Sequence, residues 1–156
     1  MELKHAAVTD AVIGLFYQVY RTLGYGFLER VYANAMALAG RKRGLVIVQE
    51  APIRVHFEGA VIGKCYPDLI VNDSVIAELK ACKNILPEHE AQLLNYLKAS
   101  RFEVGLVLNF GPRSEFKRLV LENERKGGLS WVENPVEESG KNQLDAEERG
   151  LTRKKQ

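Results

Sequence analysis

The 156-residue chain is 46% hydrophobic and 27% charged and carries a net charge of +2 at neutral pH, values typical of one globular domain. No apolar stretch approaches the ~20 residues of a membrane span, and the first residues lack the apolar core of a signal peptide, so we expect a cytoplasmic protein. Two cysteines are too few for a disulfide scaffold. The small positive charge permits nucleic-acid binding without arguing for it.

Two helices are predicted first. Apolar residues recur at helical spacing from about residue 3 to residue 22, and the glycines at 24 and 26 end that pattern. A second helical stripe runs from about residue 27 to residue 43. Three basic residues and then Gly44 close it, which suits the C terminus of a helix.

From residue 45 the apolar pattern becomes that of strands, which we predict at residues 46–50, 53–57, 61–71 and 74–82. Pro87 opens a third helix to about Ser100, and strands at 104–110 and 116–122 follow. This order, two helices, four strands, a helix and two strands, indicates an α/β fold with a mixed central β-sheet flanked by helices. Residues 133–156 are polar and predicted to be disordered, which leaves a folded domain at residues 1–132.

Two acidic residues and a lysine lie within two adjacent apolar runs. Asp68 follows Pro67 at the start of one run, and Glu78 and Lys80 lie two positions apart in the next. Charged side chains are rarely buried unless they are paired or bind a metal. Residues 72–74, Asn-Asp-Ser, predict a turn that joins the runs into a hairpin, on which Glu78 and Lys80 share a face. Hard oxygen ligands beside a fixed ammonium are what a Mg²⁺-dependent phosphodiester hydrolase requires.

Each of these side chains also has a plainer interpretation. Asp68 could be an exposed residue at a strand start, Glu78 could face water on an edge strand, and Lys80 could pair with it or guard the edge against aggregation. Turn length distinguishes the interpretations. A two-residue turn places Asp68 opposite Ala77, whereas a three-residue turn or a bulge places it opposite Glu78 on one face. We predict one of the latter two, because a shared metal site demands it.

The third helix and the start of the second offer further candidates. His89, Gln92 and Tyr96 lie on one stripe of the third helix. This stripe is either an ordinary polar face or places Gln92 beside the metal as an amide that contacts phosphate or water. Glu29 is either an acid favourably placed at a helix N terminus or a third carboxylate on the metal. Spacing alone does not decide these cases.

Taken together, these residues resemble a known family. Residues 24–35, GYGFLERVYANA, are similar to the signature of the GxxExxR family, a branch of the PD-(D/E)XK nuclease superfamily. Further segments agree in order and spacing, namely residues 49–55, 66–71, 78–81, 89–97 and 105–111. The resemblance covers roughly residues 5–122. The arginine that ends the family's name is Tyr32 here, which we expect to serve packing or phosphate contact rather than catalysis.

The resemblance implies a restriction-endonuclease-like core and a catalytic metal site. Asp68 and Glu78 would bind Mg²⁺ or Mn²⁺, with the Leu79 carbonyl as a further ligand. Lys80 would orient the attacking water and stabilise the charge that develops on the phosphorus centre. The further candidates are Glu29 and Gln92 for catalysis, and His89 and Tyr96 for substrate binding.

Two functions from different classes stay open. The first is a metal-dependent nuclease acting on DNA or RNA, and the alternative is a non-catalytic module on the same fold that binds nucleic acid or protein. Nucleic acid is the expected partner, and no membrane association is expected. Small nucleases of this fold often work as dimers, so a homodimer is a further expectation, although no stretch of the sequence shows an interface.

Overall fold

A computed structural model of the protein describes residues 3–127, and the predicted tail at 133–156 lies outside the described residues. The elements, in chain order, are α1 (Ala6–Leu23), α2 (Glu29–Lys42), β1 (Ile47–Gln49), β2 (Ile53–Phe57), β3 (Ala60–Cys65), β4 (Leu69–Val71), β5 (Val75–Lys80), α3 (Pro87–Lys98), β6 (Val104–Phe110), β7 (Ser114–Val120) and the short 3-10 helix η1 (Asn123–Arg125). The predicted α/β class and its three helices are confirmed. None of the described helices combines the length and apolarity that crossing a membrane requires.

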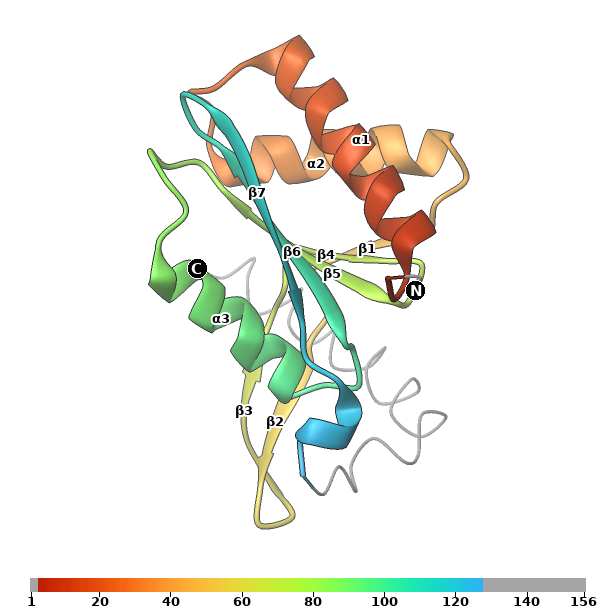
Figure 1. The fold of residues 1–156 in the computed structure, drawn as a ribbon, viewed down its shortest axis with the longest axis vertical. Helices are drawn as coiled ribbons and strands as arrows, with labels where there is room; N and C mark the ends of the chain where they lie inside the picture. The colour runs from red at the N-terminus through yellow and green to blue at the C-terminus, as the bar shows by residue number, and fades with distance from the viewer. Residues whose placement is uncertain (1–2, 128–156) are drawn as a thin grey trace, which may run out of the picture.

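The main sheet has five strands in the order β1-β4-β5-β6-β7 (Figure 1). Only β5 and β6 are parallel, and the other neighbours are antiparallel. The connection between β5 and β6 passes through α3, as the crossover of a parallel pair requires. The sheet is therefore mixed, and the carboxyl ends of its two central strands lie at the same edge.

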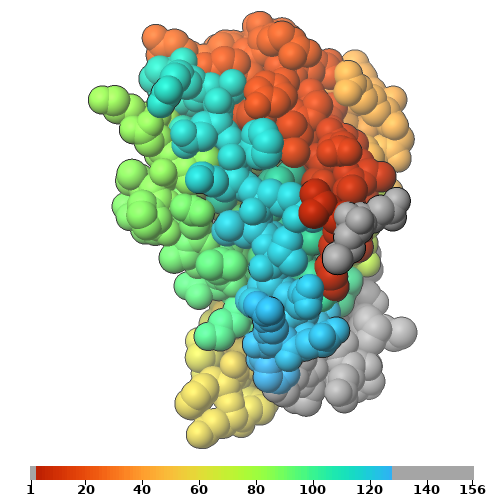
Figure 2. Space-filling view, in the orientation of Figure 1, coloured from red at the N-terminus to blue at the C-terminus, as the bar shows by residue number. Residues whose placement is uncertain are grey.

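One predicted strand is wrong in its extent. Residues 61–71 were expected to form a single strand, but the chain leaves the sheet after Cys65 and returns to it at Leu69. Pro67 lies in this break and has no N–H to donate to a ladder. β3 instead pairs with β2 in a separate two-stranded sheet, which projects from the body as an arm (Figures 1 and 2).

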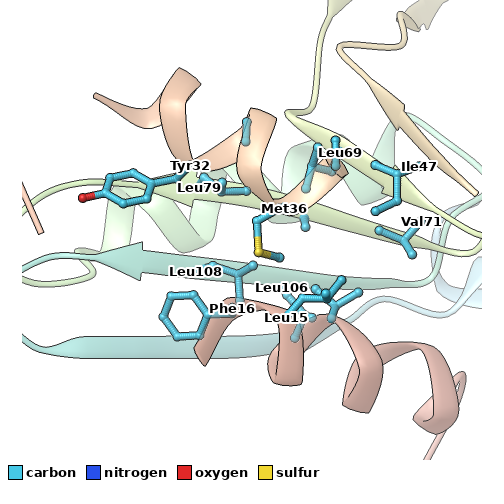
Figure 3. Close-up of a cluster of buried hydrophobic side chains, with 14 of the residues drawn as sticks. Leu15, Phe16, Tyr32, Met36, Ile47, Leu69, Val71, Leu79, Leu106 and Leu108 are labelled. Carbon is cyan, nitrogen blue, oxygen red and sulfur yellow. The ribbon is translucent and has the colours of Figure 1, made fainter. Parts of the chain in front are cut away.

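Helices cover both faces of the main sheet, and each face has its own core. α1 and α2 pack on one face, where Leu15, Phe16 and Met36 meet side chains of the sheet (Figure 3). α3 covers the other face, where Leu93 and Leu97 pack against Ile70, Ile76 and Val107. Every residue of β5 before Lys80 is buried, as expected of a strand between two helical layers.

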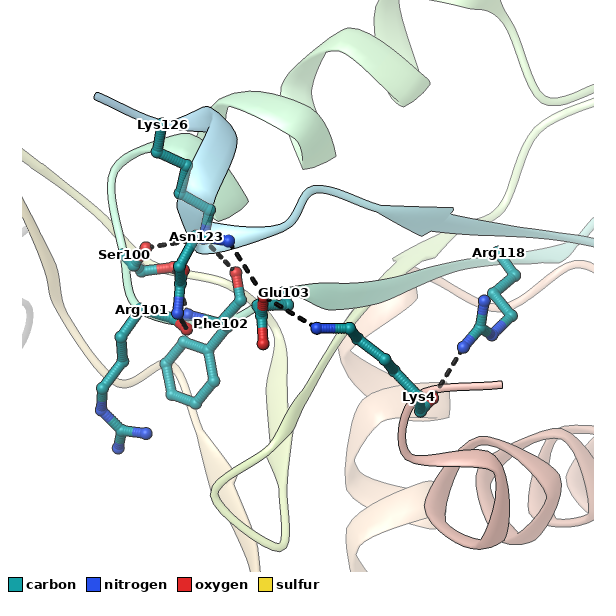
Figure 4. Close-up of polar contacts among 8 residues, drawn as sticks. All are labelled: Lys4, Ser100, Arg101, Phe102, Glu103, Arg118, Asn123 and Lys126. Carbon is teal, nitrogen blue, oxygen red and sulfur yellow. Dashed lines mark hydrogen bonds and ion pairs between the residues drawn. The ribbon is translucent and has the colours of Figure 1, made fainter. Parts of the chain in front are cut away.

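Polar contacts fasten both ends of the described chain to the turn before β6 (Figure 4). The Lys126 ammonium donates to the carbonyl oxygens of Ser100 and Phe102, at 2.9 and 2.6 Å. Glu103 accepts the backbone N–H of Asn123 at 2.9 Å and pairs with Lys4 at 3.2 Å. These contacts hold the two ends of the described chain against the amino end of β6, away from the carboxyl ends of β5 and β6.

The exit of β5 is anchored to β6 by one side chain. Asn109, which is fully buried, accepts the backbone N–H of Cys82 at 3.0 Å and donates to the Cys82 carbonyl at 2.9 Å. Gly111 lies so close to this segment that an added Cβ would stand 2.0 Å from the Cys82 carbonyl oxygen. The backbone direction after Lys80 therefore depends on the side-chain amide of Asn109 and on the lack of a side chain at Gly111.

We expect Gly111→Ala to destabilise the protein by about 2 kcal/mol, because the new methyl group must displace the backbone at Cys82. Gly14→Ala is a matched control, since it lies within α1 and its added Cβ would meet no atom within 4 Å. That change should be neutral or stabilise by up to about 1 kcal/mol, because alanine favours helix. Urea unfolding of both variants measures the difference, and equal stabilities would contradict the prediction.

Candidate active site

The turn between β4 and β5 decides which side chains face one another. Val71 pairs with Val75 and Leu69 with Ala77, so three residues, 72–74, form the loop. The Ser74 N–H donates to the Val71 carbonyl at 3.1 Å, and the two residues between them have φ near +50°, as in a type I′ turn. Of the two predicted devices, a three-residue turn or a bulge, the three-residue turn is the one present. Extended by one residue, this register places Asp68 opposite Glu78.

Asp68, which directly precedes β4, and Glu78 of β5 are hydrogen-bonded to each other's strand. The Asp68 backbone N–H donates to Glu78 Oε1 at 2.8 Å, and the Leu79 backbone N–H donates to Asp68 Oδ2 at 2.8 Å. The Asp68 carboxylate thus takes the position that a strand carbonyl would otherwise occupy. Both carboxylates lie on the α3 side of the sheet, because they share the alternation of Ile70 and Ile76.

Burial and mutual repulsion make this pair electrostatically costly. Glu78 is only 4% exposed. Burial, followed by the nearby charge of Asp68, raises the pKa of Glu78 from its ordinary value of 4.5 to about 8. Burial also raises the pKa of Asp68, while its hydrogen bond from Leu79 and the charge of Lys80 act in the opposite direction. The site therefore favours a bound proton or another cation between the two carboxyl groups.

A chain of hydrogen bonds links the hairpin to α3. The Lys80 ammonium donates to Gln92 Oε1 at 2.9 Å, and Gln92 Nε2 donates to the Tyr96 hydroxyl oxygen at 2.9 Å. Burial and the charge of Glu78 raise the pKa of Tyr96 to about 12, so the phenol keeps its proton at neutral pH. The amide of Gln92 thereby fixes the direction of the Lys80 side chain.

The remaining sequence candidates are placed as follows. Glu29 is the first residue of α2, is exposed, and lies close enough to Asp68 for its charge to raise the pKa of that carboxyl. His89 Nδ1 accepts the Leu86 backbone N–H at 3.0 Å and so caps α3. Because Nδ1 is the acceptor, Nε2 of the neutral ring carries the hydrogen. The structure thus brings Asp68, Glu78, Lys80 and Gln92 together, with Glu29 within electrostatic reach.

One neighbour of the site was not singled out in the sequence. Glu50 follows β1, and its backbone N–H donates to the Asp68 carbonyl at 3.1 Å. Its charge also raises the pKa of Asp68, and its φ of 54° is unusual for a residue other than glycine. In the sequence it reads only as the polar end of a strand, so no local signal indicated its position.

The donor set suits a hard divalent cation. Two carboxylates crowded in a buried site supply hard oxygen atoms and an excess of negative charge that a cation relieves. The Leu79 carbonyl belongs to the residue between Glu78 and Lys80 and could add a third oxygen. In the described part of the chain no three His, Cys, Asp or Glu side chains gather as a metal-binding group, so a metal here would rely on two carboxylates, a carbonyl and water.

A family profile described as the PD-(D/E)XK nuclease superfamily matches residues 6–119. The crystal structure of an alkaline exonuclease (LHK-Exo) from Laribacter hongkongensis matches with 16% identity and a TM-score of 0.37, covering 98% of this chain and 87% of that chain. No curated protein matches the sequence.

The raised pKa of Glu78 predicts a pH-dependent stability in the absence of metal. Folded Glu78 keeps its proton up to about pH 8, whereas the unfolded side chain releases it near 4.5. The folded state binds the extra proton between these values, so its stability should fall as the pH rises through this window. Glu78→Gln cannot ionise and should exceed the wild type in stability above the window by up to about 5 kcal/mol, which is the linkage cost of a pKa shift of this size.

Urea unfolding in the presence of a chelator, below and above this window, measures the effect. Ionisations of groups that do not interact with Glu78 are common to both variants and cancel in the difference between them. A constant difference between Glu78→Gln and wild type at both ends of the window would contradict the assigned pKa.

Proposed function

We propose that this chain, which belongs to the PD-(D/E)XK nuclease superfamily, hydrolyses phosphodiester bonds in DNA or RNA with the help of Mg²⁺ or Mn²⁺. The observation that carries the proposal is the pair of carboxylates, Asp68 and Glu78, joined across the hairpin beside a lysine that Gln92 orients. Within the superfamily we place the chain in the GxxExxR branch on the sequence of residues 24–35. A cytoplasmic location and a homodimer remain expectations.

Asp68, Glu78 and the Leu79 carbonyl would hold the metal ion. When bound, it would neutralise the two carboxylates and lower the pKa of a coordinated water, which is the chemistry that hydrolysis needs. Burial strengthens this effect, because the interaction of opposite charges increases as the local dielectric constant falls. The same burial makes the pair dependent on a cation, since Glu78 otherwise takes up a proton.

Lys80 supplies a positive charge at the end of β5. One of its three N–H donors is used on Gln92, which leaves two for the attacking water or a phosphate oxygen. An ammonium held in a fixed direction stabilises the charge that develops during the reaction without reorganising. Gln92 is therefore a positioning residue for Lys80, and Tyr96 does the same for Gln92.

Glu29 begins α2, and His89 lies in the first turn of α3. Glu29 can complete the ligand environment through a water, because its charge acts on Asp68 without a direct hydrogen bond between them. The Nε2–H of His89 can donate to a phosphate oxygen, since Nδ1 is used on the Leu86 N–H. In these roles Glu29 contacts a water and His89 contacts the substrate, and neither residue replaces Asp68 or Glu78 as a metal ligand.

With Mg²⁺ or Mn²⁺ the purified protein should cut single- or double-stranded DNA or RNA, and a chelator should stop it. Asp68→Asn should lower the cleavage rate by at least about 100-fold, because an amide still accepts the Leu79 N–H but no longer contributes a negative charge. The measurement is the rate of product formation on a labelled oligonucleotide. Lys80→Ala should cause a loss of similar size.

Asp73→Asn is a matched control, because Asp73 lies in the same hairpin loop but pairs with Arg101 on the surface. It should cut like the wild type. Calorimetric titration with Mn²⁺ separates the two functions considered for this fold: the enzyme should bind the ion and Glu78→Gln should not. Cleavage that survives Asp68→Asn, or ion binding that survives Glu78→Gln, would contradict the proposal.

Gln92→Ala should lower the cleavage rate by about 10-fold or more while leaving Mn²⁺ affinity nearly unchanged, because it releases Lys80 but touches no metal-binding oxygen. Asn95→Ala, an exposed position on the same helix, is the control and should be silent in both measurements. A Gln92→Ala variant that cuts at the wild-type rate would show that Lys80 needs no such support.

A further inference from the structure

Three large apolar side chains stand exposed in the short connection between α1 and α2. Tyr25 is 63% exposed, Phe27 48% and Leu28 76%. Single exposed apolar residues are common on protein surfaces, but three within four positions are a concentration that calls for a partner. We refer to Tyr25, Phe27 and Leu28 as the loop platform.

The loop platform is held rigidly by the residue that replaces the arginine of the family signature. Tyr32 is fully buried, donates its hydroxyl to the Gly24 carbonyl at 2.7 Å and accepts the Phe27 backbone N–H at 3.2 Å. Its ring stacks on Phe110 of β6 with centroids 4.1 Å apart and meets the Phe27 ring edge-on. The expectation that Tyr32 serves packing is thus met, and its hydroxyl also fixes the loop.

The loop platform lies next to the candidate active site. Leu28 directly precedes Glu29, whose charge acts on Asp68. Tyr32 shares a core with Leu79 (Figure 3), which lies at the same end of β5 as Glu78 and Lys80 but on the opposite face of the sheet. A polymer that is bound at the carboxylate pair and extends past Glu29 would therefore reach the loop platform at Leu28.

The charges around the loop platform suit a polyanion. Arg21 and Arg30 flank it in sequence, and Arg113 lies on the β6–β7 turn, which Tyr20 ties to α1 through the Gly111 and Pro112 carbonyls at 2.7 and 3.0 Å. All three arginines are exposed. Among residues 3–127 none of them forms an ion pair, so their charges are available to phosphates.

We propose that the loop platform binds unpaired nucleobases, so that the substrate of this site is a nucleic acid with a single-stranded segment. The inference rests on the proposed function and names its substrate class. Duplex bases stack on one another and present phosphates outward, whereas unpaired bases offer flat faces to aromatic and apolar side chains. A second copy of the chain fits less well, because a symmetric contact through this surface would bring like-charged arginines together.

The test is fluorescence anisotropy with a labelled single-stranded oligonucleotide and a blunt duplex of the same sequence, in a chelator so that nothing is cut. Tyr25→Ala and Leu28→Ala should each weaken single-strand binding by about 5- to 100-fold and change duplex binding by less than about twofold. Tyr25→Phe should bind like the wild type, because the ring is retained. Arg30→Ala should weaken the binding of both oligonucleotides and reduce the salt dependence of that binding.

Leu38→Ala is the matched control, since Leu38 is 60% exposed on the same helix α2 but lies more than two turns from Glu29. It should bind both oligonucleotides like the wild type. Thermal melting of each variant verifies that the fold is kept. Equal losses for single strand and duplex, no loss in Tyr25→Ala, or a dimer that Leu28→Ala dissociates in light scattering would each overturn the inference.

Failure of this inference can be told apart from failure of the proposed function. Asp68-dependent cleavage together with unchanged binding in Tyr25→Ala would overturn the proposed role of the loop platform and support the nuclease function. Selective single-strand binding that Tyr25→Ala abolishes, in a protein that cuts nothing with any metal, would remove the nuclease and leave the loop platform. A wild type that binds no nucleic acid would overturn both.

Discussion

The reciprocal hydrogen bonds between Asp68 and the strand that carries Glu78 join the fold of this protein to its chemistry. Neighbouring strands are normally joined by backbone hydrogen bonds. Here, next to Pro67 at the start of β4, the side-chain carboxylates of Asp68 and Glu78 accept backbone N–H groups instead. The same contacts hold the hairpin in register and draw two negative charges into a buried space. The preference for a proton or another cation between the two carboxyl groups is therefore a consequence of how the hairpin is closed.

The rest of the site depends on the crossover from β5 to β6. Since these strands are parallel, the chain must pass over the sheet between them, and α3 makes that passage. The side chain that meets Lys80 consequently comes from the crossover helix, and the side chain that anchors the exit of β5 comes from β6. Four elements thus contribute to one edge of the sheet, and no local stretch of sequence contains the complete arrangement.

Much of this could be predicted from the sequence, because the relevant signals are local. Helical spacing indicated the first two helices and Pro87 the start of the third, and the residues between Val71 and Val75 set the register that faces Asp68 toward Glu78. The division of residues 61–71 into two strands was missed although Pro67 lies at the break, since the pairing of β3 with β2 is a tertiary choice. The position of Glu50 beside Asp68 and the role of Tyr32 in the loop were missed for the same reason. Each depends on contacts between segments that are distant in the chain.

The connection between β5 and α3 is clamped at two points by side chains of the other strands. Asn109 is hydrogen-bonded to both the N–H and the carbonyl of Cys82, and Glu115 accepts the N–H of Ile85 at 2.8 Å. Only Lys83 and Asn84 lie between the clamps, and both are exposed. The Lys83 and Asn84 side chains take part in neither clamp, so substitutions there leave the backbone at Cys82 and at Ile85 held as before. This short span is consequently where the connection between β5 and α3 can vary in its side chains while both clamps stay in place.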